Sequence, residues 1–331
     1  MKKMSKTFIN NAITYALVIV AFIVMTILQN AGVLTRSMKG QLIPICVYIV
    51  MAVSLNLVVG ISGELCLGHA GFMSVGAFTG VVAAACLEGG VPSPTLRLIL
   101  AMIVGGLLAA VAGVIIGVPV LRLRGDYLAI VTLACGEIIK NVITNLNFTG
   151  GALGLNTTAI YAGAKELLPY GAVLVLLTVA VMLNLKRSKY GRAIMAIRDN
   201  RIAAESVGVN VTTHKMTAFV ISAAMAGAAG PLFAMNYSTI VANKFDFNTS
   251  ILILVFVVLG GQGNMLGSII AAAVLTILPE ALREYSDYRM LVYAILLIVM
   301  MLATNNPTIK GFLENVKNKI THKDTKEKEG V

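Results

Sequence analysis

Long apolar runs separated by short polar stretches dominate this chain. A transmembrane helix needs ~20 mainly apolar residues, and ten runs of 11 to 22 residues are candidates, several of them short. They cover residues 12–28, 42–61, 66–87, 98–118, 128–144, 170–185, 216–236, 250–260, 265–280 and 290–303. The runs are continuous rather than alternating, which favours helices over membrane β-strands. The sequence therefore predicts an all-α, polytopic membrane protein with about ten transmembrane helices.

Composition agrees with this pattern. Of the 331 residues, 58% are hydrophobic and 12% are charged, whereas ordinary soluble domains are ~45–50% apolar and ~25% charged. A soluble globular protein is therefore excluded. The formal net charge of +11 does not indicate nucleic-acid binding, because the basic residues are not gathered on one soluble face. Residues 12–28 also exceed the ~7–15 apolar residues of a signal peptide, so we expect an uncleaved first span.

The basic residues predict the orientation. With the N-terminus in the cytoplasm, the inner segments of the ten-span topology carry 18 Lys and Arg residues, and the outer loops carry 7. Cytoplasmic loops usually hold this excess, so both termini are expected in the cytoplasm. This topology needs a hairpin turn at 260–264. We expect a membrane domain at 1–303, with a cytoplasmic loop at 186–215, and a polar cytoplasmic tail at 304–331.

Sequence motifs for enzymes are missing. The chain contains no GxxxxGK[ST], HExxH or GxSxG, so the phosphate-binding loop of an ATPase and common hydrolase sites have no support. No catalytic residue is predicted, and no cofactor is expected on this chain. The four cysteines, Cys46, Cys66, Cys86 and Cys135, lie in apolar stretches without a CxxC motif. We interpret them as small buried hydrophobic residues rather than as a disulfide or metal site.

One acidic residue lies at membrane depth. Glu137 is in the middle of the run 128–144, and Lys140 follows it one helical turn later. Side chains at positions i and i+3 of a helix can touch, so the two charges can neutralise each other. The pair either fixes helix packing or provides a polar lining for a transport pathway.

Two glycine-rich segments form the other candidate site. Small residues permit close helix packing, but glycines also permit broken helices, which line substrate cavities in transporters. Residues 59–63 and 259–263 resemble each other weakly, and this similarity could reflect an internal repeat or chance. His69 is expected to be hydrogen-bonded structurally rather than to carry protons. The predicted pathway or gate residues are Asn56, Gly60, Gly63, Gly68, His69, Glu137, Gly260, Gly261 and Gly263.

The loop 186–215 contains a predicted short helix. Asn200 can cap a helix that starts at Arg201 and ends near Gly208, a residue suited to a left-handed C-terminal cap. A solvated basic loop would need neither the caps nor an apolar face. A helix that docks into a groove on a cytoplasmic partner accounts for both. Its small, partly apolar face would consist of Ile202, Ala203, Ser206 and Val207.

At this loop the sequence resembles a known family. The segments SKYGRA at 188–193, AAESVGVN at 203–210, KMTAF at 215–219 and AGAAG at 226–230 are similar to permease subunits of branched-chain amino-acid ABC importers. Further similar blocks lie at 59–77, 125–151 and 258–280. The resemblance thus runs in family order from about residue 50 to residue 285.

The resemblance implies a pore-forming half-transporter in a bacterial or archaeal cytoplasmic membrane. Its partners would be a homologous permease subunit, two cytoplasmic ATPases that use ATP, and an extracytoplasmic solute-binding protein. By similarity, the coupling helix that contacts an ATPase would comprise Arg201, Ile202, Ala203, Ala204, Glu205, Ser206, Val207 and Gly208.

The implied substrate is a branched-chain amino acid, although similar permeases carry urea, short amides or other small solutes. The alternative from another class is an ion-coupled secondary transporter. That class would need several carboxylates within the membrane, and only Glu137 clearly qualifies.

Overall fold

The computed structural model describes residues 6–31, 36–90, 93–123, 125–157 and 164–282, together with Leu291, Ala294, Ile295 and Ile298. The chain divides into two compact units, Met1–Ile277 and Leu278–Val331. The description below concerns the first unit, apart from the last residues of α11. The predicted span 290–303, apart from those isolated positions, and the predicted tail 304–331 lie outside the described residues.

Each of the first nine predicted spans coincides with a helix. Several boundaries were wrong: the first, second, fourth, sixth and seventh helices begin four to six residues before the predicted spans. The third helix begins later than predicted, at His69 rather than near residue 66, because residues 62–68 are not helical. The helices that correspond to these spans are α1 (Lys6–Asn30), α2 (Arg36–Asn56) with the π-helical turn η1 (Leu57–Ile61), α3 (His69–Cys86), α4 (Pro94–Val120), α5 (Asp126–Asn145), α6 (Ala164–Arg187), α9 (Val211–Met235), α10 (Phe247–Gly260) and α11 (Met265–Ala281).

The helices are long enough for a membrane protein. In the described part of the chain, seven are long and apolar enough to cross a membrane, and shorter apolar helices cover Thr14–Gln29 and Met265–Glu280. Large apolar side chains are exposed on the outer helices, including Ile27 at 60%, Leu107 at 62% and Ile130 at 59%. Such rows of exposed apolar side chains suit lipid or a partner subunit rather than water. The chain is a multi-pass membrane protein.

Close packing of α3, α4 and α9 forms the core of this unit, and small residues make it possible. At Gly76 on α3, an added Cβ would lie 2.0 Å from the carbonyl oxygen of Gly227 on α9. At Gly105 on α4, it would lie 2.7 Å from the carbonyl oxygen of Gly76. The backbones of these three helices therefore approach at positions where only glycine fits.

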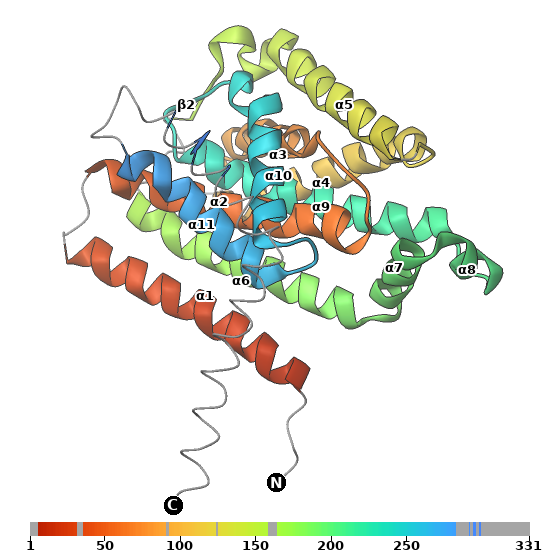
Figure 1. The fold of residues 1–331 in the computed structure, drawn as a ribbon. Coiled ribbons are helices and arrows are strands. Elements are labelled where there is room, and N and C mark those ends of the chain that lie inside the picture. The colour runs from red at the N-terminus through yellow and green to blue at the C-terminus, as the bar shows by residue number, and fades with distance from the viewer. Residues whose placement is uncertain are drawn as a thin grey trace, which may run out of the picture. The chain divides into compact units, whose positions relative to one another are not determined.

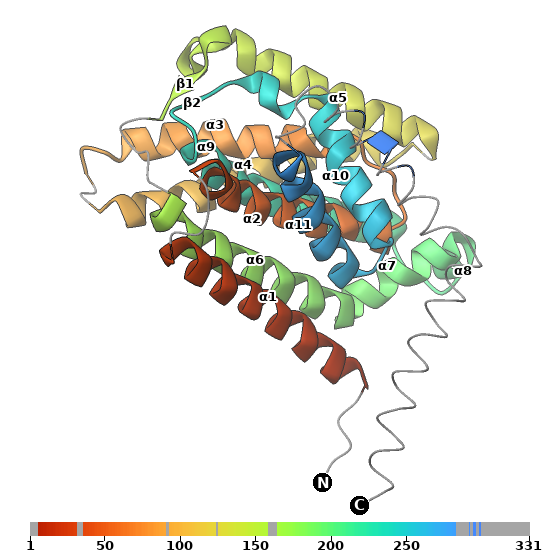
Figure 2. The same ribbon diagram turned by 60° about the vertical axis from the view of Figure 1, so that its left-hand side comes forward.

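Helix α2 runs through the interior, and almost all of it is buried. Helix α1 lies alongside α6, and α5 lies on the opposite side of α2 (Figures 1 and 2). Two further helices, α7 (Lys189–Asp199) and α8 (Arg201–Ser206), extend beyond one end of α6 (Figure 1).

A small antiparallel strand pair was not predicted. Strand β1 (Leu155–Asn156) pairs with β2 (Thr239–Ile240), and the Thr157 N–H donates to the Ser238 carbonyl at 2.9 Å. Short 3₁₀ turns flank the pair: η2 (Asn147–Thr149), η3 (Gly151–Leu153) and η5 (Ala242–Phe245). The pair joins the connection after α5 to the connection after α9.

The prediction for the cysteines was partly wrong. All four are free thiols, and Cys46 and Cys66 are buried as expected. Cys135 is half-buried, and Cys86 is exposed. Cys86 is exposed because it is the last residue of α3, directly before an exposed turn.

Candidate functional site

Helix α2 ends in a break inside the protein. In η1 the Ser62 N–H donates to the Leu57 carbonyl at 3.0 Å, a spacing of five residues. The chain then leaves the helix at Gly63, whose φ is +75°. Residues 57–61 are all buried. A broken helix was one of the two interpretations of this glycine-rich segment, and π-helical turns occur frequently at functional sites.

Asn56 connects this break to the turn between α10 and α11. Its side chain is fully buried. The amide nitrogen Nδ2 donates to Ser268 Oγ at 2.9 Å and to the Asn264 carbonyl at 3.2 Å. The amide oxygen Oδ1 accepts from the Gly263 N–H at 2.8 Å. The Asn56 side chain thus makes hydrogen bonds to two backbone groups and one hydroxyl group in and beside the turn at 260–264.

The two segments that resemble each other in sequence are therefore in contact. A Cβ at Gly60 would lie 2.2 Å from the Gly263 nitrogen. Within the α10–α11 hairpin, a Cβ at Gly260 would lie 2.4 Å from both Gly267 C and Ser268 N, so the second turn is itself tightly packed. We call this contact between residues 56–63 and 260–264 the glycine crossing. It places the predicted pathway residues Asn56 and Gly60 against Gly263. Three further predicted residues, Gly63, Gly260 and Gly261, lie in the same two segments.

Gly68 and His69 lie in a separate cluster at the start of α3. A Cβ at Gly68 would lie 2.0 Å from the Thr132 carbonyl oxygen on α5, so glycine is needed for this contact. His69 is 1% exposed, and its Nε2 lies 2.8 Å from Ser54 Oγ. The expectation that His69 is hydrogen-bonded is confirmed.

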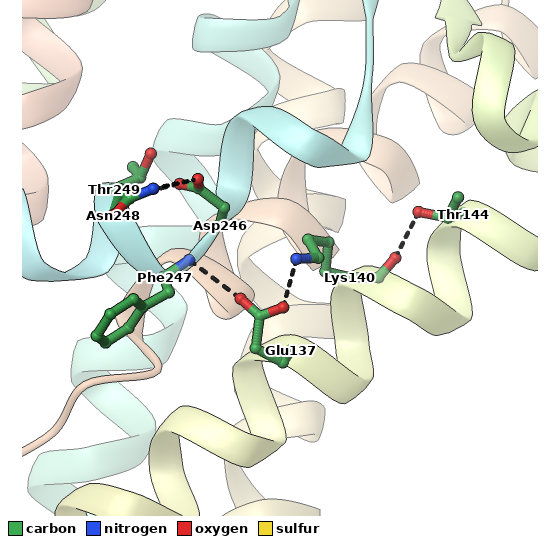
Figure 3. Close-up of polar contacts among 7 residues, drawn as sticks. All are labelled: Glu137, Lys140, Thr144, Asp246, Phe247, Asn248 and Thr249. Atoms are coloured by element: carbon green, nitrogen blue, oxygen red, sulfur yellow. Dashed lines mark hydrogen bonds and ion pairs between the residues drawn. The ribbon is translucent and has the colours of Figure 1, made fainter.

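Glu137 lies on α5 facing the start of α10 (Figure 3). Its Oε2 forms an ion pair with Lys140 Nζ, as the spacing predicted. Its Oε1 accepts from the Phe247 N–H at 3.0 Å, and a carboxylate is favoured at a helix N-terminus. Asp246 caps the same helix by accepting from the Thr249 N–H at 2.9 Å. The polar contacts of Glu137 are thus with α10 and Lys140, not with the glycine crossing.

The predicted short helix in the loop 186–215 is α8. Asn200 Oδ1 accepts from the Ala203 N–H at 3.0 Å, as expected for an N-terminal cap. At the other end, Gly208 has a φ of +83°. The Gly208 N–H donates to the Glu205 carbonyl at 3.0 Å, and the Val209 N–H donates to the Ala204 carbonyl at 3.1 Å. These two bonds form a Schellman cap.

Most of α8 is exposed. Only Ala204 is buried, where it packs against Ile197 and Val211. Ile202 is 80% exposed and Val207 is 77% exposed. The face predicted for docking, which also includes Ala203 and Ser206, is therefore open in this chain.

Two cationic contacts at the glycine crossing, and a third beside it, were not predicted from the sequence. Arg198 donates to the Gly60 carbonyl, and Lys186 donates to the Gly263 carbonyl. Lys215 forms an ion pair with Glu64, whose side chain is 11% exposed. The sequence offered one signal, since Glu64 and Lys215 are opposite charges that both adjoin apolar spans. Within the described ranges, no group of three His, Cys, Asp or Glu residues could hold a metal ion.

Comparisons with known proteins identify relatives of this chain. It is 36% identical over 295 residues to the high-affinity branched-chain amino acid transport system permease protein LivM of Salmonella typhimurium, covering 77% of this chain and 66% of that protein. It is 30% identical over 178 residues to a probable LivM of Methanocaldococcus jannaschii, covering 51% of this chain and 52% of that protein. It is 25% identical over 271 residues to the ribose import permease protein RbsC of Haemophilus influenzae, covering 77% and 81%.

The chain thus spans just under two thirds of the length of the Salmonella protein. No solved structure matches it. A family model described as "Branched-chain amino acid transport system / permease component" matches residues 37–304, most of the chain. The chain belongs to this family of permease components of branched-chain amino acid transport systems.

Proposed function

We propose that this chain is the membrane-spanning subunit of an ATP-driven importer of branched-chain amino acids. Two cytoplasmic ATPase subunits would supply the energy, and an extracytoplasmic binding protein would deliver the solute. A homologous permease subunit would complete the pathway. Family membership supports this assignment, as does the similarity to proteins named as branched-chain amino acid permeases.

The observation that carries the proposal is the exposed, doubly capped helix α8. An isolated helix of six residues is marginal in water, yet α8 is capped at both ends and held by Ala204. Its largest apolar side chains, Ile202 and Val207, point away from the permease. A helix presented in this way suits a groove on a partner protein. We assign that groove to an ATPase subunit.

This assignment sets the orientation. The end of the unit that carries α7 and α8 would face the cytoplasm, in agreement with the excess of basic residues predicted for the inner segments. Both chain termini would be cytoplasmic. ATP binding would close the ATPase pair and move α8, and the permease halves would switch between outward and inward openings. The chain would provide different contacts in the two states and would perform no covalent chemistry.

The glycine crossing is our candidate for the moving part of the pathway. It joins a broken helix to a second glycine turn through Asn56. Gly68, His69 and Glu137 would belong to the surrounding walls, where they fix α3, α5 and α10.

Other solutes are the main alternative. The similar protein from Haemophilus influenzae is named as a ribose import permease, which supports a scaffold that can serve small solutes other than amino acids, such as urea or short amides. The binding protein would select among them. Ligand binding by the cognate binding protein, measured by calorimetry with leucine, isoleucine, valine, urea and ribose, would decide the substrate.

An ion-coupled mechanism has weaker support. It would require carboxylates that gain and lose ions within the membrane. Glu137 is the candidate carboxylate, and its two oxygens already contact Lys140 and the start of α10.

The docking role of α8 can be tested by retention of the ATPase subunits. A tagged complex carrying Ile202→Asp should lose most of its ATPase subunits, because a charge would enter an apolar groove. The matched control is Phe148→Asp, which places the same charge on a 62% exposed apolar residue outside α8. Equal retention in both variants would refute the docking role.

A further inference from the structure

Arg198 joins the last turn of α7 to the break in α2. Its Nη1 donates to the Gly60 carbonyl at 2.8 Å. Gly60 belongs to the final turn before the helix ends, where carbonyls lack intrahelical N–H partners and attract cations. The aliphatic part of the side chain lies over Gly63, where an added Cβ would be 2.7 Å from Arg198 Cγ. Arg198 therefore contacts the break twice, through its aliphatic chain at Gly63 and through its guanidinium at Gly60.

Two lysines make related contacts from the helices on either side of α7 and α8. Lys186, near the end of α6, donates from Nζ to the Gly263 carbonyl at 3.2 Å. Lys215, near the start of α9, pairs with Glu64, and both side chains are close to nine-tenths buried. Each of the segments that lead into and out of the α7–α8 region thus contacts the glycine crossing or the residue beside it.

Helices α7 and α8 are built to move together. Asn200 is the single residue between them, and it ends α7 while capping α8. Behind α8, Ile197 from α7 and Val211 from α9 pack on Ala204. Arg198 directly follows Ile197 of this cluster in the chain, so a displacement of α8 that shifts Ile197 would also shift Arg198.

We infer that Arg198 is a positioning residue that transmits the displacement of α8 to the break in α2. The contact at Gly60 passes the movement to η1, and Asn56 passes it to the turn at Gly263. This path runs from α8 to α7 through the packing of Ala204 on Ile197, and from Arg198 to both halves of the glycine crossing through hydrogen bonds. The inference rests on the proposed function and identifies the residue that links docking to the pathway.

The test uses the complete transporter in proteoliposomes, with its ATPase subunits and binding protein. Leucine uptake and ATP hydrolysis are measured in the same preparation. Arg198→Gln should keep the ATP hydrolysis rate but lower leucine uptake per ATP about tenfold, the factor expected for loss of a charge-assisted hydrogen bond. The control is Arg192→Gln, which removes the same charge from an exposed position on α7. It should behave like the wild type.

Equal uptake per ATP in the two glutamine variants would overturn the inference. If Arg198→Gln does not assemble, Arg198→Lys is compared with Arg192→Lys, because lysine keeps the charge but cannot contact Gly60 and Asp199 together as the guanidinium does. Reduced coupling only at position 198 supports the inference, and equal coupling refutes it. Failure of the wild type to take up leucine with ATP would instead refute the proposed function.

Discussion

At the scale of single residues, the glycine crossing has almost no free space around the Cα atom of Gly60. A Cβ at Gly60 would lie 1.9 Å from Asn56 Oδ1 and 2.2 Å from the Gly263 nitrogen. Both atoms belong to the hydrogen bond that joins the two turns. A single methyl group would therefore separate the broken helix from its partner turn.

We expect Gly60→Ala to lower the free energy of unfolding in detergent by about 1–3 kcal/mol, the usual cost of overpacking, and to reduce uptake. Thermal unfolding of the purified permease measures the change. Gly40→Ala is the control, since nothing lies within 4 Å of a Cβ there. In a helix, Ala at this open position should be neutral or stabilising. Equal loss of stability in both variants would contradict the packing described for Gly60.

At the scale of elements, α8 depends on its caps. It buries only Ala204, so tertiary packing contributes little to its stability. The Schellman cap needs a left-handed residue at position 208, and Gly208 has a φ of +83° with nothing within 4 Å of a Cβ. A substitution there therefore tests backbone conformation without adding a clash.

We expect Gly208→Ala to weaken ATPase binding several-fold, because alanine in a left-handed conformation costs about 1 kcal/mol or more. Titration of the ATPase subunits onto the permease gives the affinity. Gly125→Ala is the control for a strained glycine outside α8, since Gly125 also has a positive φ, +58°, and open space around it, with a ψ of −133°. A Gly208→Ala permease that binds as tightly as the control would show that α8 does not need its cap to dock.

Variants at the contact between α5 and α10 can distinguish the two roles of Glu137, helix packing and lining of the pathway. Glu137→Gln keeps an oxygen for the Phe247 N–H but leaves Lys140 without its ion pair. If Glu137 lines the pathway, uptake should fall while expression stays unchanged. The double variant Glu137→Gln, Lys140→Met removes the unpaired charge as well. Uptake restored in the double variant would assign the pair to packing, and uptake still low would assign Glu137 to the pathway.

Local chemistry explains which elements could be predicted. The bounds of α8 followed from Asn200 and Gly208, because a cap and a left-handed glycine act on adjacent residues. The start of α3 was misplaced, since apolar composition does not separate the non-helical residues 62–68 from a helix. Strands β1 and β2 are two residues long, and each exists through a partner distant in sequence.

Long-range contacts explain what the sequence could not show at the site. Arg198 and Gly60 are 138 positions apart, and no periodicity relates a basic loop residue to a glycine carbonyl. The weak similarity of 59–63 to 259–263 did not indicate that the two segments touch. The glycine crossing depends on how α2 and α10 pack, which is a property of the folded chain.

At the scale of the whole molecule, the structure combines two kinds of surface. Exposed apolar side chains on α1, α4 and α5 suit lipid or a second permease subunit. The exposed face of α8 lies beyond the end of α6 (Figure 1) and suits a soluble partner. The neighbouring helices α6 and α7 make polar contacts with the glycine crossing, through Lys186 and Arg198. This arrangement is expected when energy is supplied from outside the membrane domain.

The most direct test of this account is the energy source for uptake. Proteoliposomes would contain the permease with its homologous subunit and ATPases, with the binding protein and radiolabelled leucine outside and nucleotide trapped inside. We predict that leucine accumulates with ATP and does not accumulate with ADP, in the absence of any ion gradient. Accumulation with ADP when a proton or sodium gradient is imposed, and none with ATP alone, would contradict the account.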